Sequence, residues 1–418
     1  MTTFSSLSME KGDKLSFTHV AHPARGDEED IHCEIAGNML RLSYGGKEYV
    51  YPVAHVGSMK KDKVQSQDKL LVGRIGIGKL FDLPYGIKNM TFIDERQFIC
   101  GMTGGNIALV NDGKVVWKTA LEEEIHATEY VAPEKLIAVG HGNNKLSVLD
   151  LKGNILWEVR IKRIPTLFHT WELAYPQIVK IKYLKSREGT FIVAGCGDNH
   201  IRIFDTKGDM INAFYLFATV PDTIEIVDID GDGELEIVST GKYDSCHGVF
   251  RVRDIKGNLK RDIWVSGWLC TIRTHRLTGG NGKFRLVTGN NYGANFKIFD
   301  IENGIQKTVC EKSLGGIVNS VLINDEQTFI CAGTSKGSVL GFDIDGNHLW
   351  HVYVKDSVKE LFSADNRIIA VCENGKVSVI SSEGVVMTEG ILPDKPACCI
   401  KTSDKVMVGC GNAVYIIE

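Results

Sequence analysis

Short runs in which apolar and polar residues alternate recur along the chain, and they predict β-strands. In KLSVLD (Lys145–Asp150) and IRIFD (Ile201–Asp205) the apolar side chains largely fall at every second position, as in a strand with one buried face. Each such strand follows an apolar run that ends in glycine and precedes an Asp-x-x-Gly turn. Asp fixes such a bend through hydrogen bonds to its own backbone, and Gly adopts angles that other residues avoid.

The unit repeats, and its period predicts the fold. The first apolar run of each unit ends at Gly101, Gly140, Gly195, Gly241, Gly289, Gly333, Cys372 and Gly409, at intervals of 37 to 55 residues. Another strand-like run precedes each of these, so a unit holds four strands. Repeated four-stranded units of this length indicate an all-β chain that forms a single β-propeller, in which neighbouring sheets bury one another's faces. Eight markers predict eight blades, and seven is the alternative.

The last unit stops after two strands, KVMVG and AVYIIE, and lacks an outer strand. We expect an N-terminal strand to supply it, because closure removes an exposed sheet edge. Residues 14–20 and residues 39–53 are the candidates. The expected organisation is an N-terminal segment, residues 1–80, that contributes the closing strand, followed by propeller repeats over residues 81–418.

The repeat resembles the pyrroloquinoline-quinone-like (quinoprotein-type) propeller repeat, A-x-G-x-x-D-x-x-I-x-x-x-D-x-x-G-x-x-x-W. The matching positions are Ala194, Gly195, Asp198, Ile201 and Asp205 in one unit, Asp150, Gly153 and Trp157 in another, and Asp343, Gly346 and Trp350 in a third. The resemblance covers roughly residues 86–418 and implies the propeller fold, but such motifs say little about function. WD-repeat propellers rank second, because the Gly-His and Trp-Asp signatures are missing.

The sharpest local motif is DIDGDGELEIV, residues 228–238. Asp228, Asp230 and Asp232 occupy positions 1, 3 and 5 of a calcium loop, with the carbonyl of Glu234 at position 7 and the carboxylate of Glu236 at position 9. The loop resembles those of integrin-type (FG-GAP) propeller repeats, which implies a calcium ion. The alternative is a metal-free turn stabilised by its Asp side chains. In either case the role is structural, since only one blade carries the motif.

Composition and charge exclude several functions. Lys and Arg number 48 against 52 Asp and Glu, a net charge of −4, so no basic surplus exists to neutralise nucleic-acid phosphates or anionic membranes. We see no secretory signal and no apolar run of about 18 residues that could span a bilayer. The eleven cysteines include no C-x-x-C pair, and we expect reduced thiols and a cytoplasmic location. Cys398–Cys399 lies in a strand-like run, and we expect no pyrroloquinoline quinone.

Polar aromatic residues predict where the protein binds its ligand. In a propeller, the connections between blades and between second and third strands open on one face around a central funnel. On this loop face, blades two to five carry the candidate ligand-binding residues Trp171, Tyr243, Trp268 and Tyr292. The connection 161–176 is the longest between blades, and long loops in compact folds are often functional. The alternative is that turns are polar by default.

Two classes of function follow. The first is a soluble propeller that binds a protein, peptide or small-molecule ligand through the loop face of blades two to five. The second is a lyase, isomerase or hydrolase with a His and a carboxylate, or a His-bound metal, in the funnel. The candidate acid–base residues are His126, His169, His247, Glu225 and Arg273.

Overall fold

The structure is a computed structural model of the chain. It describes residues 73–74, 76–165, 175–216, 221, 223–229, 232–242, 247–266, 269–276, 283–291, 295–302, 305–324, 326, 328–402 and 405–417, together with five strands before residue 53. Contacts divide the chain into two units, Met1–Leu70 and Leu71–Glu418. In the first unit, β1 (Leu7–Glu10) pairs with β2 (Lys14–Phe17), and β3 (His32–Ala36), β4 (Met39–Tyr44) and β5 (Lys47–Pro52) form a three-stranded antiparallel sheet.

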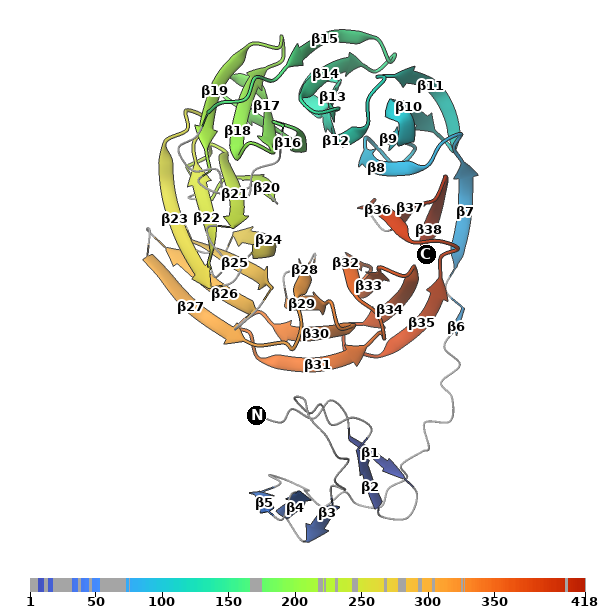
Figure 1. Cartoon of the computed structure of the whole chain (residues 1–418), viewed down its shortest axis with the longest axis vertical. Helices are drawn as coiled ribbons and strands as arrows, with labels where there is room; N and C mark the ends of the chain where they lie inside the picture. Colours follow the sequence, from blue (N-terminus) through green and yellow to red (C-terminus); the bar gives the residue numbers. More distant parts are fainter. Residues whose placement is uncertain are drawn as a thin grey trace. The chain divides into compact units, whose positions relative to one another are not determined.

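The second unit is a ring of eight antiparallel sheets around a central funnel (Figure 1), as the repeat count predicts. Blades 1 to 4 contain β8 (Ile87–Phe92), β9 (Gln97–Met102), β10 (Asn106–Asn111) and β11 (Lys114–Ala120); β12 (Ile125–Val131), β13 (Leu136–His141), β14 (Lys145–Asp150) and β15 (Ile155–Arg160); β16 (Ile178–Ser186), β17 (Gly189–Cys196), β18 (His200–Asp205) and β19 (Met210–Tyr215); and β20 (Ile224–Val227), β21 (Glu236–Lys242), β22 (His247–Arg253) and β23 (Leu259–Ser266).

Blades 5 to 8 continue the ring. They contain β24 (Leu269–Arg276), β25 (Lys283–Asn290), β26 (Phe296–Glu302) and β27 (Ile305–Lys312); β28 (Val318–Ile323), β29 (Phe329–Thr334), β30 (Ser338–Asp343) and β31 (His348–Tyr353); β32 (Val358–Ala364), β33 (Arg367–Cys372), β34 (Lys376–Ser381) and β35 (Val386–Ile391); and β36 (Pro396–Lys401), β37 (Val406–Cys410) and β38 (Ala413–Ile417). Helix is limited, in the described residues, to two 3-10 turns, Thr103–Gly105 and Ala132–Glu134. No described helix is long and apolar enough to cross a membrane.

Blade 8 is completed by an N-terminal strand, but not by either of the segments that the sequence suggested. Its outer strand is β7 (Ile77–Asp82), which runs antiparallel to β38 from Ile77 opposite Ile417 to Asp82 opposite Ala413. The candidates were wrong: in the first unit, the strand within residues 14–20 pairs with β1, and the two strands within residues 39–53 pair with each other. In addition, β6 (Gly73–Arg74) extends blade 7 by pairing in parallel with β35.

The marker glycines let adjacent blades approach closely. A Cβ atom on Gly140 would lie 2.6 Å from the side chain of Ile178, and one on Gly195 would lie 2.7 Å from Ile224. Ile178 and Ile224 are the first residues of the inner strands in the following blades. Contacts this short do not occur with real side chains, so glycine is required here for space and not for an unusual backbone angle.

The Asp-x-x-Gly turns also bind the preceding blade. Trp157 of blade 2 lies against Gly208 in the turn of blade 3, and its indole N–H donates to the carbonyl oxygen of Thr206 at 2.9 Å. Gly208 has φ +98°, and a Cβ there would meet the indole at 3.0 Å. Trp117 and Trp350 make the same contact with the following blade. The repeat motif is therefore a contact between blades as well as a signature within one.

Candidate functional site

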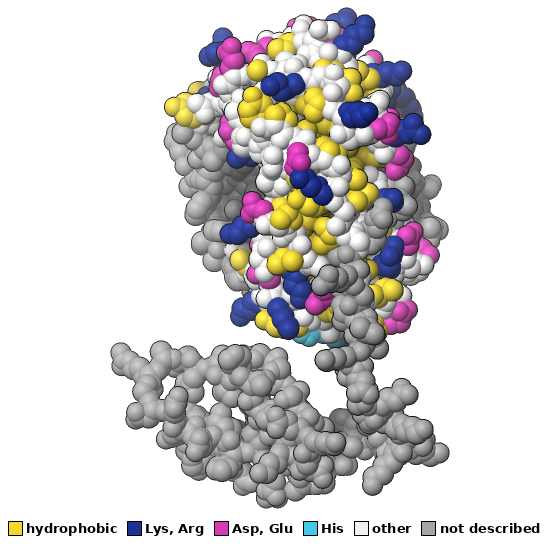
Figure 2. All heavy atoms as spheres, turned by 90° about the vertical axis from the view of Figure 1, so that its right-hand side faces the viewer, with side chains coloured by type: hydrophobic (Ala, Val, Ile, Leu, Met, Phe, Trp, Pro, Cys, Tyr) yellow, Lys and Arg dark blue, Asp and Glu magenta, His cyan; other side chains and the backbone are white. Residues whose placement is uncertain are grey.

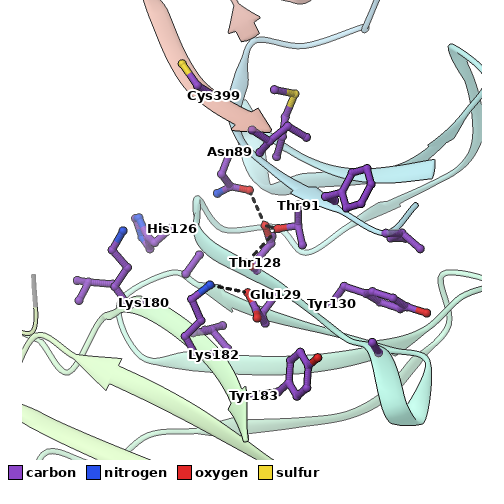
Figure 3. A pocket seen from close by; sticks show the side chains of 18 of the residues that line it. Asn89, Thr91, His126, Thr128, Glu129, Tyr130, Lys180, Lys182, Tyr183 and Cys399 are labelled. Atoms are coloured by element: carbon purple, nitrogen blue, oxygen red, sulfur yellow. Dashed lines mark hydrogen bonds and ion pairs between the residues drawn. The ribbon is translucent and has the colours of Figure 1, made fainter. Parts of the chain in front are cut away.

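The inner strands of blades 1 to 3 enclose a cavity of about 650 Å³ in the funnel, together with β32 and β36 (Figure 3). This volume falls in the range of roughly 300–1,000 Å³ that is typical of ligand sites. Its lining side chains are mostly polar, and they alternate with buried apolar residues along each inner strand. The labelled residues in Figure 3 are Asn89, Thr91, His126, Thr128, Glu129, Tyr130, Lys180, Lys182, Tyr183 and Cys399.

The end of the cavity near the loop face is formed by Asn89, His126 and Lys180, which stand close to the starts of their inner strands. Adjacent strands β12 and β16 project His126 and Lys180 into it (Figure 3). Burial lowers the pKa of His126, against the opposing effects of the Glu124 charge and the Gly142 backbone. The imidazole is therefore mostly neutral at pH 7.

The middle of the cavity holds an ion pair between blades 2 and 3. Lys182 Nζ lies 3.6 Å from a carboxylate oxygen of Glu129. Burial raises the pKa of Glu129, and the ammonium of Lys182 only partly counteracts this. The pair neutralises both charges on this part of the wall.

A hydrogen-bonded group joins blades 1 and 2 beside this pair. The Thr128 hydroxyl donates to the amide oxygen of Asn89 at 3.0 Å and lies 2.6 Å from the Thr91 hydroxyl. Thr91 also donates to the Thr128 carbonyl at 3.1 Å. These contacts occupy the hydroxyls and fix the Asn89 carboxamide at the rim, with its NH₂ group on the cavity side.

The opposite end is aromatic. Tyr130 and Tyr183 line it (Figure 3), and burial raises the pKa of Tyr130, so its phenol stays protonated. Glu360 and Cys399 line the wall contributed by blades 7 and 8. Burial raises the pKa of the Cys399 thiol well above its usual range and that of Cys398 to about 12. Neither thiol is a thiolate at neutral pH.

The sequence-based candidates are only partly brought together. His126 lines the main cavity, whereas Glu225 lines a second cavity of about 350 Å³ beyond Glu129 and Lys182. His247 and Arg273 lie in β22 and β24, and their side chains are outside the described part of the structure. The remaining candidates, His169, Trp171, Tyr243, Trp268 and Tyr292, lie outside the described residues.

Four residues of the cavity wall were not predicted from the sequence: Lys180, Lys182, Glu129 and Asn89. For three of them the signal was available: IKNMTF and IVKIKYL place Asn89, Lys180 and Lys182 at alternate positions of strands expected to be innermost, whereas Glu129 is out of phase with the alternation in IHATEYV. In a propeller those positions face the funnel, so the alternation itself marks the cavity wall.

The acidic loop, residues 228–236, joins β20 to β21, and its carboxylates form ion pairs with Lys and Arg side chains. Glu236 is 1% exposed, accepts the backbone N–H of Ile229 at 2.9 Å and lies 2.6 Å from Lys260 Nζ. Lys260 is also 3.4 Å from Asp232, and Arg187 pairs with Glu234 at 2.7 Å. The remaining carboxylate described here, that of Asp228, accepts the Gly233 N–H at 3.2 Å, while Asp230 is outside the described residues.

This pairing changes the argument for calcium. Repulsion among the loop carboxylates is relieved at Asp232 and Glu236 by Lys260, so repulsion alone does not require a metal. Within the described residues no group of three His, Cys, Asp or Glu side chains is arranged to hold a metal ion. Calcium binding stays a prediction, and Lys260 is the residue that a bound ion would have to displace.

Comparisons with known proteins agree with this architecture. A family described as outer membrane protein assembly factor BamB matches residues 85–207, which supports the PQQ-like repeat assigned to blades 1 to 3. No curated protein sequence matches the chain significantly.

Solved structures similar to this chain are propellers of low sequence identity, and they establish its fold class. Sqt1 from Saccharomyces cerevisiae is 14% identical with a TM-score of 0.66, covering 82% of this chain and 98% of that one. Sqt1 from Chaetomium thermophilum, bound to the N-terminus of ribosomal protein L10, is 11% identical with a TM-score of 0.62, covering 81% and 98%. BamB from Moraxella catarrhalis is 12% identical with a TM-score of 0.58, covering 82% and 97%.

Proposed function

We propose that this propeller is a binding module that takes a protein partner on its loop face, with the funnel cavity of blades 1 to 3 at the centre of the contact. The observation that carries the proposal is the cavity itself, whose wall combines fixed polar groups, paired charges and two tyrosines. Concave sites with a few oriented polar groups are the usual places where proteins bind ligands.

The chemistry of the wall favours binding over catalysis. The Cys399 thiol is protonated, and the Thr91 and Thr128 hydroxyls are hydrogen-bonded to each other. A nucleophile needs an adjacent base within about 3 Å, and the described interactions give neither hydroxyl such a partner. The groups present can orient a partner without reacting with it.

The similar solved structures support a protein as the ligand. One of them, the Chaetomium Sqt1 propeller, was solved with the N-terminus of ribosomal protein L10 bound. We place the aromatic candidates Trp171, Tyr243, Trp268 and Tyr292 around the same contact, on the loop face of blades two to five. Amphipathic rings serve as anchors in protein interfaces because they combine large apolar area with a polar edge.

We also place the protein in the cytoplasm. The eight cysteines whose side chains the structure describes are free thiols, and most are buried in strands where they pack as small apolar residues. A reducing compartment keeps such thiols in this form.

Photo-crosslinking tests the location of the contact. A photoreactive amino acid is placed at Lys180, on the cavity wall of blade 3, or at Lys207, an exposed residue in the β18–β19 turn of the same blade. In cells, the Lys180 variant should form adducts of a few defined masses that the Lys207 variant does not form. Identical adduct patterns from both positions would refute the proposal.

Substitution by face extends the test to the other blades. Once a partner has been identified from the adducts, Trp171→Ala and His247→Ala should weaken its binding, whereas Lys336→Ala, in a short turn of blade 6, should not. Equal losses from both sets at unchanged stability would contradict the placement on blades two to five.

A further inference from the structure

We propose that the loop-face end of the cavity recognises an acidic side chain of the partner, followed about four residues later by an aromatic or large apolar side chain. The inference rests on the proposed function and specifies the chemistry of the partner. It follows from how the charges at the rim are paired and from the order of groups along the inner strands.

The charges of the neighbouring residues leave Lys180 as the available cation. Lys182 is paired with Glu129 at 3.6 Å, and Lys88 is paired with Glu124 at 2.9 Å. Lys180 is exposed, lines the cavity and makes no ion pair with any residue that the structure describes. An ammonium in this position binds a carboxylate from outside.

Two further groups at the rim suit a carboxylate. The Asn89 amide is held by Thr128 through its oxygen, which leaves the NH₂ group as a donor. The His126 ring lines the cavity beside Lys180, and a carboxylate bound there favours the protonated ring, which then donates a second N–H to it. A carboxylate needs several donors, since it accepts up to four hydrogen bonds.

The connection that leaves blade 2 carries more positive charge. Lys162 is exposed there, and its carbonyl oxygen accepts a hydrogen bond from Arg202 at 3.0 Å. The acidic groups Glu123 and Glu124 of the same face are paired with Lys145 and Lys88. A local cationic surplus of this kind steers an acidic segment to its site.

The deep part of the cavity is suited to a different side chain. Among the described residues it offers no cation for a second carboxylate, because Lys182 is paired with Glu129, and Glu360, which has an interaction of its own, is the other charged residue of its walls. Tyr130 and Tyr183 offer ring surface at the far end. Tyr130 follows His126 by four residues on one strand, which corresponds to about 13 Å at 3.3 Å per residue. An extended segment of the partner therefore reaches both ends of the cavity if its acidic and aromatic residues are about four positions apart.

A defined peptide tests this directly. The probe is the capped heptapeptide Gly-Asp-Ala-Ser-Ala-Phe-Gly, compared by titration calorimetry and NMR with versions in which Asp is replaced by Asn or Lys. We expect saturable binding of the Asp peptide that weakens in high salt, because ion pairs at the rim are screened. The Asn peptide should bind up to about fivefold more weakly, and the Lys peptide more weakly still or not at all. Absence of binding of the Asp peptide up to about 5 mM, corresponding to a free energy weaker than about −3 kcal/mol, would overturn the inference.

Charge reversal supplies the matched variants. Lys180→Glu should weaken binding of the Asp peptide about tenfold and allow the Lys peptide to bind, whereas Lys207→Glu in the same blade should change neither. Unchanged affinity in Lys180→Glu, or equal losses in both variants, would overturn the inference. Both substitutions are at exposed positions, so folding is preserved and is checked by the melting temperature.

The two proposals fail in different ways. If adducts form at Lys180 but the Asp peptide does not bind, the protein-binding face stands and the acidic specificity is wrong. If the peptide binds and loses affinity in Lys180→Glu, but no cellular adduct forms at Lys180, the cavity binds acidic ligands and the proposed protein partner is wrong. Binding of acetate or inorganic phosphate as tightly as the peptide would show a site for free anions, and it would overturn the peptide inference.

Discussion

The outer strands of this propeller carry similar exposed residues in several blades, whereas the inner strands carry different residues from blade to blade. On the outer strands, large apolar side chains are exposed at the same place in several blades: Val116 is 56% exposed, Leu156 53% and Leu349 53%, each directly before a docking tryptophan. Figure 2, which faces the right-hand side of Figure 1, shows hydrophobic side chains gathered on that part of the outer surface of the ring. On the inner strands, the second residue changes from blade to blade.

That second position is Lys88 in blade 1, His126 in blade 2, Val179 in blade 3, Glu225 in blade 4 and Asn319 in blade 6. A feature that recurs in every unit is a property of the repeat, whereas one that differs between units distinguishes one blade from another. We therefore assign the exposed apolar residues to the repeat, and the varied wall is where we propose that recognition takes place.

The largest effect that we expect lies away from both surfaces, in the ion pair of blade 3. Asp198 and Arg202 are 0% and 1% exposed, and their bidentate contacts measure 2.7 and 2.6 Å. Asp198→Asn should lower the free energy of unfolding by about 3 kcal/mol, because it leaves a buried guanidinium without its counter-charge. Urea denaturation measures it, and a loss below 1 kcal/mol would show that the pair contributes little.

The same pair predicts the pH dependence. Burial opposes ionisation, but hydrogen bonds from Arg202 and His200 outweigh it and hold the pKa of Asp198 well below its usual range. A lowered carboxylate pKa adds stability above the unfolded value of about 3.9, and this stability is lost as pH falls toward the folded value. The difference in free energy of unfolding between wild type and Asp198→Asn should therefore become smaller as pH falls below about 3.9.

The next effect concerns the contact between blades that the repeat motif creates. Trp157→Ala should cost about 2 kcal/mol, since it removes a large, partly buried ring packed on Gly208. Trp157→Phe keeps most of the apolar contact but loses the hydrogen bond to the Thr206 carbonyl. The loss of this hydrogen bond should cost about 1 kcal/mol, in addition to the small change in packing. Equal costs in the two variants, measured by denaturation, would contradict the proposed division between packing and hydrogen bonding.

Calcium should have a smaller effect, through the acidic loop. If the loop binds calcium with a Kd near the working concentration, millimolar calcium stabilises the fold by about 0.5–1 kcal/mol, and a chelator reverses this. Asp230→Ala should abolish the response. Lys260→Met should enlarge it, because the ammonium competes for Glu236 and Asp232. An unchanged melting curve for both wild type and Lys260→Met in millimolar calcium would rule the ion out.

His126 gives a small effect on the inner wall. Because burial lowers its pKa, the folded state binds this proton less readily than the unfolded state, so stability decreases as pH falls from about 6.5 toward the folded pKa. His126→Gln should remove this pH-dependent contribution to the free energy of unfolding, which is less than about 1 kcal/mol. The stability of the variant should therefore differ less between pH 7 and pH 5 than that of wild type. An unaltered slope would show that the ring titrates normally.

The smallest effect is expected on the outer strands. Leu156→Ser should change stability by no more than about 0.5 kcal/mol and leave peptide binding unchanged, because an exposed surface position loses little on substitution. A loss of binding from this variant would reverse the comparison and assign recognition to the outer edge.

The repeat and the blade count could be predicted from the sequence because glycine, aspartate and tryptophan recur wherever the same contact recurs. Gly208 and Trp157 are conspicuous for that reason. The closing strand could not be chosen correctly, since Ile77–Asp82 has no feature that distinguishes its edge pairing from the alternating residues 39–53. Pairing of this kind is decided by where the ring leaves an open edge.

The cavity was predicted at only one residue, His126. Analysis of polar aromatic residues in loops overlooked Lys180 and Glu129, which lie in strands and would count as core or solvent positions in an ordinary sheet. Whether such a residue lines the cavity depends on whether its strand is innermost in the ring. Whether its charge is available to a ligand depends on the charged residues of the neighbouring blade, as for Glu129 and Lys182. Both are properties of the closed ring and not of any single unit.

The pairing of β7 with β38 also sets a delay during synthesis of the chain. About 335 residues separate Asp82 from Ile417, which belong to the same blade. At roughly 5–20 residues per second, β7 leaves the ribosome about 20 to 70 s before its partner is made. For that interval an unpaired strand with the apolar residue Leu80 is available to other chains, and the ring closes only after β38 has emerged.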